Sequence, residues 1–172
     1  MSERTKPNAL RNQCQLITYP DCMGKTIEDM HRAVERHFRS ALGGVHILPF
    51  YPSSADRGFA PIDYKQVDAP FGTWSDVEEV ARDYDVMVDF MLNHVSQQSV
   101  QFQDFVRNKD ASPYADFFIR YSRLAPGGEI PQEDLAKIYT RKPRAPYYEF
   151  AFADGSKEKV WCTFDYEQID LN

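Results

Sequence analysis

The apolar run at residues 86–92 constrains the fold more than any other stretch of the chain. Only Asp89 interrupts it, and Asn93 and His94 follow it directly. A run this short is not long enough for a helix with its own buried side, and its composition suits a strand covered on both faces. We therefore predict a buried parallel strand with polar groups at its carboxyl end, where parallel α/β folds bind ligands.

A purely structural explanation of these polar residues stays open at this point. Asn and His often end strands because their side chains satisfy loose backbone groups. A single Asp within a strand can be a paired carboxylate of the core. Taken alone, residues 89–94 favour this explanation, and the rest of the chain has to decide.

Two earlier apolar runs predict two further strands. Residues 14–19 end at a proline, and residues 45–48 follow Gly43 and Gly44. With the run described above, they give three parallel strands. The loop at residues 49–72 is rich in Pro, Ser, Gly and Asp with interleaved aromatic residues. Loops of this length in compact domains are usually functional.

Helices are predicted between these strands from capping signals and apolar spacing. Thr26 with Asp29 matches a capping box, and Ser75 with Glu78 matches a second one. The glycine pair is expected to end the first helix. The expected inner-face residues are Ile27, Met30, Val34, Phe38, Ala41 and Leu42 in the first helix and Val77, Val80, Ala81 and Tyr84 in the second. The alternation of strands and helices indicates the α/β class.

The pattern divides the chain into three parts. Residues 1–12 are expected to form a flexible arm, residues 13–96 carry the three strand–helix units, and residues 97–172 form an inserted subdomain. Within the subdomain, apolar spacing predicts a helix at residues 101–108. Aromatic, strand-like runs around a Gly-containing loop predict a hairpin across residues 147–164.

Composition and charge argue against several classes of partner. The 172 residues include 20 Lys and Arg against 26 Asp and Glu, with a formal net charge of -6. A chain with this charge is not expected to bind nucleic acid. No apolar run is long enough to span a membrane and the amino terminus lacks a signal-like core, so we expect a cytoplasmic protein. Cys14, Cys22 and Cys162 lack zinc-ligand spacing and are expected to be small buried hydrophobes.

An ordered set of motifs resembles a known family. The motifs are QLITY (15–19), GVHILPF (44–50), DRGFAPIDY (56–64), FGTW (71–74), DFMLNH (89–94), VWCTF (160–164) and EQID (167–170). Their succession resembles the start of the sucrose phosphorylases and their close relatives in the alpha-amylase superfamily, glycoside hydrolase family 13. The resemblance covers nearly all of the chain beyond the arm, and the order of the motifs is more specific than any single one.

The resemblance implies a fold and an activity. The fold would be a (β/α)8 TIM barrel, of which this chain holds the first three strands, with a small inserted domain after the third. The activity would be retaining transfer of a glucosyl group to phosphate, with a saccharide and phosphate as small-molecule partners and no cofactor. The family's catalytic carboxylates lie on the fourth, fifth and seventh strands, so no catalytic residue is expected in this chain. The isolated chain would hold three barrel strands without the other five. It would therefore expose apolar faces and strand edges. We therefore expect the isolated chain to be marginally folded and inactive; a homodimer or a complementing second chain is compatible with the family.

Five side chains carry the substrate-binding prediction. By resemblance, Asp56 and His94 would bind hydroxyls of the glucose ring, and Phe59 would stack on its apolar face. Phe164 and Gln168 would line the pocket from the inserted domain. The residue types suit a sugar, which combines dense hydroxyls with a flat C–H face. Without the resemblance, Phe59 would be read as a loop anchor and Asp56 as part of a surface ion pair.

Three further residues are expected to support the site or set its specificity. Asp89 and Asn93 would orient the binding groups. Arg57, in the run Arg57-Gly58-Phe59, resembles the branch that acts on glucosylglycerate, glucosylglycerol or sucrose 6-phosphate. An Arg near the site would favour an anionic acceptor by bidentate pairing. A structural pairing of Arg57 with Asp63 or Asp68 is the alternative. No metal is expected, because sucrose phosphorylases lack the calcium site that Asn93-type residues form in many amylases.

Three function classes therefore remain. The first is the glucosyl-transferring phosphorylase. The second is a hydrolase or transglucosidase of the same superfamily, which would not require phosphate for turnover. The third is a non-catalytic remnant that binds sugar without forming product.

Overall fold

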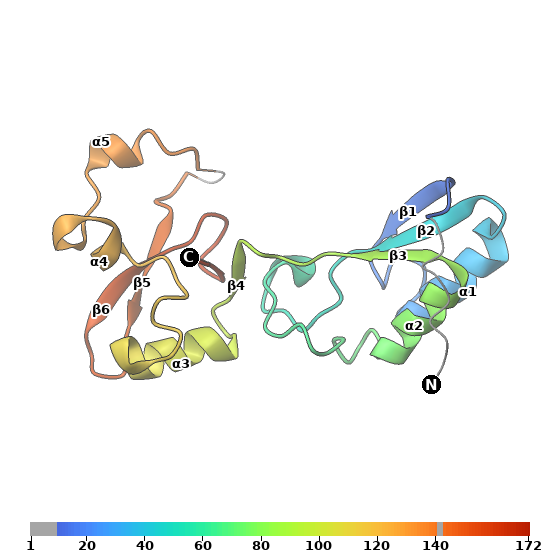
Figure 1. Ribbon diagram of the computed structural model, residues 1–172, viewed down its shortest axis with the longest axis horizontal. Coiled ribbons are helices and arrows are strands. Elements are labelled where there is room, and N and C mark those ends of the chain that lie inside the picture. Colours follow the sequence, from blue (N-terminus) through green and yellow to red (C-terminus); the bar gives the residue numbers. More distant parts are fainter. Residues whose placement is uncertain (1–9, 141–142) are drawn as a thin grey trace. The chain divides into compact units, whose positions relative to one another are not determined.

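The computed structural model of the protein describes residues 10–140 and 143–172, which form two compact units (Figure 1). Unit 1 holds the described residues up to Phe50 together with Gln66–Asp89. Unit 2 holds Tyr51–Lys65 and Phe90–Asn172. Most of the predicted arm at residues 1–12 lies outside the described residues. The boundary predicted between residues 96 and 97 stays a prediction.

Unit 1 is a parallel sheet with two helices. The strands follow the order β1 (Cys14–Thr18), β2 (Leu42–Ile47) and β3 (Asp85–Val88), with parallel pairing throughout. The connecting helices α1 (Ile27–Phe38) and α2 (Trp74–Asp83) lie on the same side of the sheet in Figure 1. This unit confirms the predicted order of strand, helix, strand, helix and strand.

The glycine pair has a different role from the predicted one. Helix α1 begins after Thr26, whose hydroxyl oxygen accepts a hydrogen bond from Asp29 N at 3.1 Å, as predicted. It ends at Phe38, however, and β2 already begins at Leu42. A Cβ atom on Gly44 would lie only 2.9 Å from the backbone oxygen of Asp85 in β3. The glycine permits the close approach of two strands rather than ending the helix.

The second helix begins earlier than predicted. Its cap is Thr73, whose backbone N and hydroxyl both donate to Asp76 Oδ2, at 2.7 and 2.8 Å. This pairing displaces the predicted Ser75–Glu78 cap by two residues. Val77, Val80 and Tyr84 are buried as expected, whereas Ala81 is exposed.

The run at residues 86–92 is not the buried strand that the sequence predicts. Strand β3 ends at Val88, and the next strand, β4, begins at His94. Met87 is 48% exposed and Leu92 is 74% exposed. Because both helices of unit 1 lie on one side of its sheet, no described element of that unit covers the opposite face. The prediction of burial on both faces is therefore wrong for the described residues.

Unit 2 combines short elements around an aromatic core. Its elements are β4 (His94–Ser96), α3 (Val100–Asn108), α4 (Tyr121–Leu124), α5 (Gln132–Leu135), β5 (Tyr147–Ala151), β6 (Lys157–Trp161) and β7 (Gln168–Asp170), with 3-10 turns η1 (Asp56–Gly58), η2 (Lys109–Ala111) and η3 (Pro126–Gly128). Strand β4 pairs with β7, and β5 with β6, both antiparallel. The core consists of Val95, Phe102, Phe105, Ala115, Phe118, Phe152, Val160, Cys162 and Ile169.

Unit 2 has an aromatic core and the hairpin that the sequence predicts. Phe102 meets Phe118 edge to face at 5.0 Å, and Phe105 meets Phe152 in the same way at 5.2 Å, which is a favoured aromatic geometry. The predicted hairpin is confirmed, with shorter strands. Strand β5 ends at Ala151, and β6 begins at Lys157. Between them, Phe152 N donates to the Ser156 backbone oxygen at 2.8 Å and closes the turn.

The three cysteines differ in burial. Cys162 is buried, and its burial raises the pKa of the thiol to about 12. Cys14 and Cys22 are exposed, so the prediction of burial is wrong for them. Within the described ranges, no helix combines the length and apolar character needed to cross a bilayer.

Candidate functional site

The five predicted substrate-binding residues lie in unit 2. Asp56 and Phe59 come from the loop before Ala60, and His94 is the first residue of β4. Gln168 is the first residue of β7, and Phe164 precedes that strand. The antiparallel pairing of β4 with β7 joins these segments through the pairs His94–Asp170 and Ser96–Gln168. We call Asp56, Phe59, His94, Phe164 and Gln168 the β4–β7 cluster.

His94 is held through both ring nitrogens. It is 6% exposed, and its Nε2 atom lies 2.7 Å from the backbone oxygen of Phe59. A carbonyl oxygen only accepts, so Nε2 carries the proton and donates. Nδ1 then accepts from the side-chain amide of Asn93 at 3.3 Å. These contacts hold the imidazole ring in a fixed orientation.

Gln168 ties the loop to β7. It is 2% exposed, and its Nε2 atom donates to Phe59 O at 2.9 Å and to Asp56 Oδ2 at 3.3 Å. The same atom lies 3.2 Å from His94 Nε2. Since both nitrogens are donors, this approach reflects their shared acceptor, Phe59 O, rather than a bond between them. One buried amide thus fixes both the carboxylate and the backbone of the loop.

The loop adopts an unusual backbone conformation at Asp56 and Arg57. Their φ angles are 53° and 48°, in the left-handed region, although neither residue is glycine. This conformation costs about 1–2 kcal/mol per residue. The bond from Gln168 to Asp56 and the bond from Phe59 N to Asp56 O at 3.1 Å maintain it. Residues held in such conformations are concentrated at functional sites.

The aromatic members and the carboxylate are partly open to solvent. Phe164 meets the His94 ring at an edge, with the ring centroids 5.2 Å apart. Phe59 is partly exposed and Asp56 is exposed. The cluster therefore combines a buried, fixed polar base with an exposed carboxylate and two partly exposed aromatic side chains.

Asp170 is a member of this network that the sequence prediction did not name. It lies opposite His94 in the β4–β7 pair and is buried. Its carboxylate accepts hydrogen bonds from Thr163 N, at 3.2 Å, and from the Thr163 hydroxyl. Burial raises the pKa of Asp170 above its ordinary value. The signal in the sequence was its spacing of two from Gln168, which places both side chains on one face of a strand.

The three supporting residues have separate positions. Asn93 contacts His94, as expected for an orienting group. Asp89 belongs to unit 1, where its Oδ2 atom lies 3.0 Å from Nε2 of His46 in β2. Arg57 is exposed beside Asp56. The roles predicted for these residues, and for the five members of the cluster, stay predictions.

Comparison with known proteins places the chain in a family. Residues 41–170 match the alpha-amylase family, described as the alpha amylase catalytic domain. The chain belongs to the alpha-amylase catalytic-domain family. Unit 1 is accordingly the beginning of a TIM barrel, and the fold class and the family resemblance predicted from the motifs are confirmed. The inserted domain stays a prediction.

Members of the alpha-amylase family that resemble this chain include several phosphorylases. The glucosylglycerol phosphorylase of Marinobacter adhaerens is 47% identical over 163 residues, which cover 95% of this chain and 33% of that protein. The sucrose phosphorylase of Streptococcus mutans is 48% identical over 161 residues, which cover 94% of this chain and 34% of that protein. The chain thus spans about a third of the length of these curated relatives.

A solved structure of the alpha-amylase superfamily shares the fold of this chain. The crystal structure of sucrose 6F-phosphate phosphorylase from Thermoanaerobacter thermosaccharolyticum matches with a TM-score of 0.91 and 45% identity. The match covers 95% of this chain and 34% of the other.

Proposed function

We propose that this chain supplies the donor-sugar side of a glucosyl-transferring phosphorylase. The reaction would move glucose from sucrose, or from a glucosyl-glycerol or glucosyl-glycerate type of donor, to phosphate with retention of configuration. The observation that carries the proposal is the β4–β7 cluster, in which Gln168 binds both Asp56 and the Phe59 carbonyl. The similarity to phosphorylases at 44–48% identity supports the same reading.

The proposed roles follow from the contacts of each side chain. Asp56 is exposed, and its carboxylate would accept hydrogen bonds from two sugar hydroxyls. The partly exposed ring of Phe59 would stack on the C–H face of the sugar. Gln168 and Asn93 would act behind them as positioning residues.

His94 has a more conditional role than the sequence suggested. Its Nε2 proton is already donated to Phe59 O. A sugar hydroxyl could accept a hydrogen bond from Nε2 only if the bond from Nε2 to Phe59 O is broken. We propose that His94 holds the loop in the free protein and turns its donor to the sugar when the donor site fills, while Gln168 keeps Phe59 O satisfied.

The chemical step requires groups that we place outside residues 1–172. Retaining glycosyl transfer uses two carboxyl groups about 5–5.5 Å apart, one as nucleophile and one as acid and then base. The family positions them on barrel strands that follow the three present here. Residues 1–172 would therefore bind and orient the donor without cleaving it.

The experiment compares this chain with the product of the complete coding sequence. Both are incubated with sucrose and phosphate, and glucose 1-phosphate is measured. We expect phosphate-dependent product from the complete protein and none from residues 1–172. Asp56→Asn in the complete protein should lower kcat/KM about 10- to 100-fold, since a hydrogen bond to a charged group is worth about 1.5–3 kcal/mol. Asp134→Asn, an exposed carboxylate on α5, serves as the matched control.

Different products would overturn the proposal. Release of glucose at the same rate without phosphate would indicate the hydrolase or transglucosidase alternative. Saccharide binding without any product from the complete protein would indicate the non-catalytic alternative.

The cytoplasmic location and the homodimer or complementing second chain stay predictions of the sequence.

We further propose that Arg57 selects an anionic substrate. It follows Asp56 directly in the loop and is exposed, so its guanidinium can pair with a carboxylate or phosphate of the acceptor part. In the complete protein, Arg57→Ala should weaken use of sucrose 6-phosphate or glucosylglycerate at least 10-fold more than use of sucrose. An equal loss on sucrose would remove the support for this role.

A further inference from the structure

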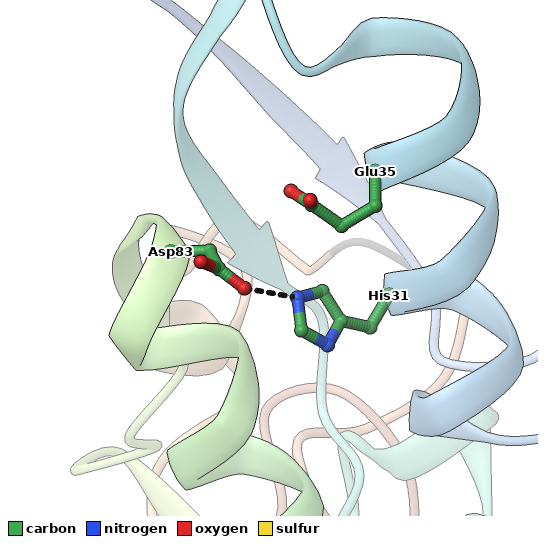
Figure 2. A group of neighbouring side chains, drawn as sticks. All are labelled: His31, Glu35 and Asp83. Atoms are coloured by element: carbon green, nitrogen blue, oxygen red, sulfur yellow. Dashed lines mark hydrogen bonds and ion pairs between the residues drawn. The ribbon is translucent and has the colours of Figure 1, made fainter.

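Unit 1 contains a second cluster of polar side chains, between α1 and α2. His31 and Glu35 are one helical turn apart on α1, and Asp83 is the last residue of α2. Figure 2 shows the three side chains turned toward one another across the gap between the two helices. One ligand atom from each residue lies within 4.8 Å of the other two.

The three side chains are already oriented by their neighbours. His31 Nε2 lies 3.1 Å from Asp83 Oδ2, and the Tyr84 hydroxyl donates to Glu35 Oε1 at 2.5 Å. Such donors behind a ligand are typical of metal sites, where they hold the coordinating carboxylate in place.

The three side chains supply two carboxylates and one imidazole as ligands, and Arg11, Arg39 and Arg82 line the same pocket as Glu35 and Asp83. Two carboxylates meet one imidazole in a partly buried space, with His31 16% and Glu35 24% exposed at the side chain. Glu35 pairs at 3.1 Å with Arg39, which directly follows α1 and whose side chain is largely exposed. Exposed pairs of this spacing contribute only about 0.3–0.5 kcal/mol, so a metal ion would displace Arg39 at little cost.

We propose that His31, Glu35 and Asp83 form a Zn²⁺ site that links α1 to α2. One imidazole nitrogen and two carboxylate oxygens, with water in the fourth position, make a tetrahedral zinc ligand set. Ligand atoms about 2.0–2.2 Å from a tetrahedral zinc ion lie roughly 3.3–3.6 Å apart. His31 Nε2 and Asp83 Oδ2 are already 3.1 Å apart, and the ligand atom of Glu35 lies within 4.8 Å of both. The imidazole favours zinc over Mg²⁺ and Ca²⁺, which prefer oxygen ligands.

The experiment is a calorimetric titration of ZnCl₂ into the chain. Because Cys14 and Cys22 are exposed thiols, all variants carry Cys14→Ser and Cys22→Ser. We expect one zinc ion per chain and a concentration-dependent rise in the unfolding temperature. His31→Gln and Asp83→Asn should each weaken binding at least 10-fold. His37→Gln, an exposed histidine of the same helix, should leave it unchanged.

Other outcomes would overturn the site. Absence of zinc binding, or binding that survives both His31→Gln and Asp83→Asn, contradicts the proposal, as does an equal loss in His37→Gln. Circular dichroism of each variant, together with Glu35→Gln as a third ligand variant, separates loss of a ligand from loss of the fold. The result is independent of phosphorolysis, because none of these residues belongs to the β4–β7 cluster.

Discussion

The two units of this chain differ in how completely they bury their apolar residues. Unit 2 encloses Phe102, Phe105 and Phe118 in an aromatic core, and the β4–β7 cluster is built on strands whose central residues, Val95 and Ile169, belong to that core. Unit 1 has helices on only one side of its sheet, and Ile17 of β1 is 61% exposed. Polar side chains keep a fixed position when the strands that carry them are anchored in a buried core. The difference explains why the candidate sugar-binding groups are ordered within unit 2.

The comparison can be tested because each unit contains one tryptophan. Trp74 begins α2 in unit 1, and Trp161 ends β6 in unit 2. Trp74→Phe and Trp161→Phe each leave a single fluorescent reporter. Urea unfolding of the two variants then measures the stability of each unit, with a lower midpoint expected for unit 1.

The largest effect is expected from Phe102→Ala. Phe102 is fully buried and meets Phe105, Phe118 and Phe150. The cavity should lower the free energy of unfolding by about 3–5 kcal/mol. The Trp161 transition should move to lower urea while the Trp74 transition stays in place. Equal shifts of both transitions would show that the units unfold as one.

A buried ion pair in unit 2 should give the next effect. Arg120 donates from Nε and Nη2 to Glu158 Oε2, at 2.9 and 2.7 Å, and both side chains are about 5% exposed. Glu158→Ala leaves the guanidinium buried with Asp110 alone and should cost about 3 kcal/mol. Glu79→Ala removes the exposed pair with Arg82 and should change stability by less than about 0.5 kcal/mol. A similar loss of unfolding free energy in both variants would mean that burial does not determine how much an ion pair contributes to stability.

A smaller effect, confined to unit 1, is expected from Gly44→Ala. The added methyl group would meet the Asp85 backbone oxygen, which cannot move without separating β2 from β3. Such overpacking typically costs about 1–3 kcal/mol. The Trp74 transition should shift alone. A shift of the Trp161 transition instead would contradict the assignment of this sheet to a separate unit.

The smallest effect is a pH dependence in unit 2. Burial raises the pKa of Asp170, so the folded state holds this proton to a higher pH than the unfolded state does. The stabilisation is full below the unfolded value of 3.8 and is lost as pH rises through the folded pKa. The stability of Asp170→Asn relative to the parent, followed by Trp161 fluorescence, should therefore increase with pH. A difference that stays constant with pH would contradict the raised pKa.

The sequence predicted contacts within elements better than contacts between them. The start of helix α1 follows from its capping signal, and the hairpin follows from aromatic, strand-like runs around a Gly-containing loop; both signals are local. The role of Gly44 depends on the Asp85 backbone, and the end of β3 depends on what covers it, so neither could be read from local pattern.

The candidate site shows the same division. The motifs predicted the members of the β4–β7 cluster. The contacts between these members are visible only in the folded chain: Gln168 donates to Asp56, 112 residues away, and His94 donates to Phe59 O. Asp170 escaped the prediction because its importance comes from its cross-strand position opposite His94.

The most direct test of the β4–β7 cluster is a glucose titration of the chain followed by nuclear magnetic resonance. The side-chain amide of Gln168 and the ring of His94 are the signals to follow, with Gln168→Ala as the variant that removes the tie to Asp56. A donor-sugar site predicts saturable shifts of both signals, with weaker binding in the variant. If neither signal moves up to saturating glucose, or if the only shifts arise in unit 1, the cluster is not a saccharide site.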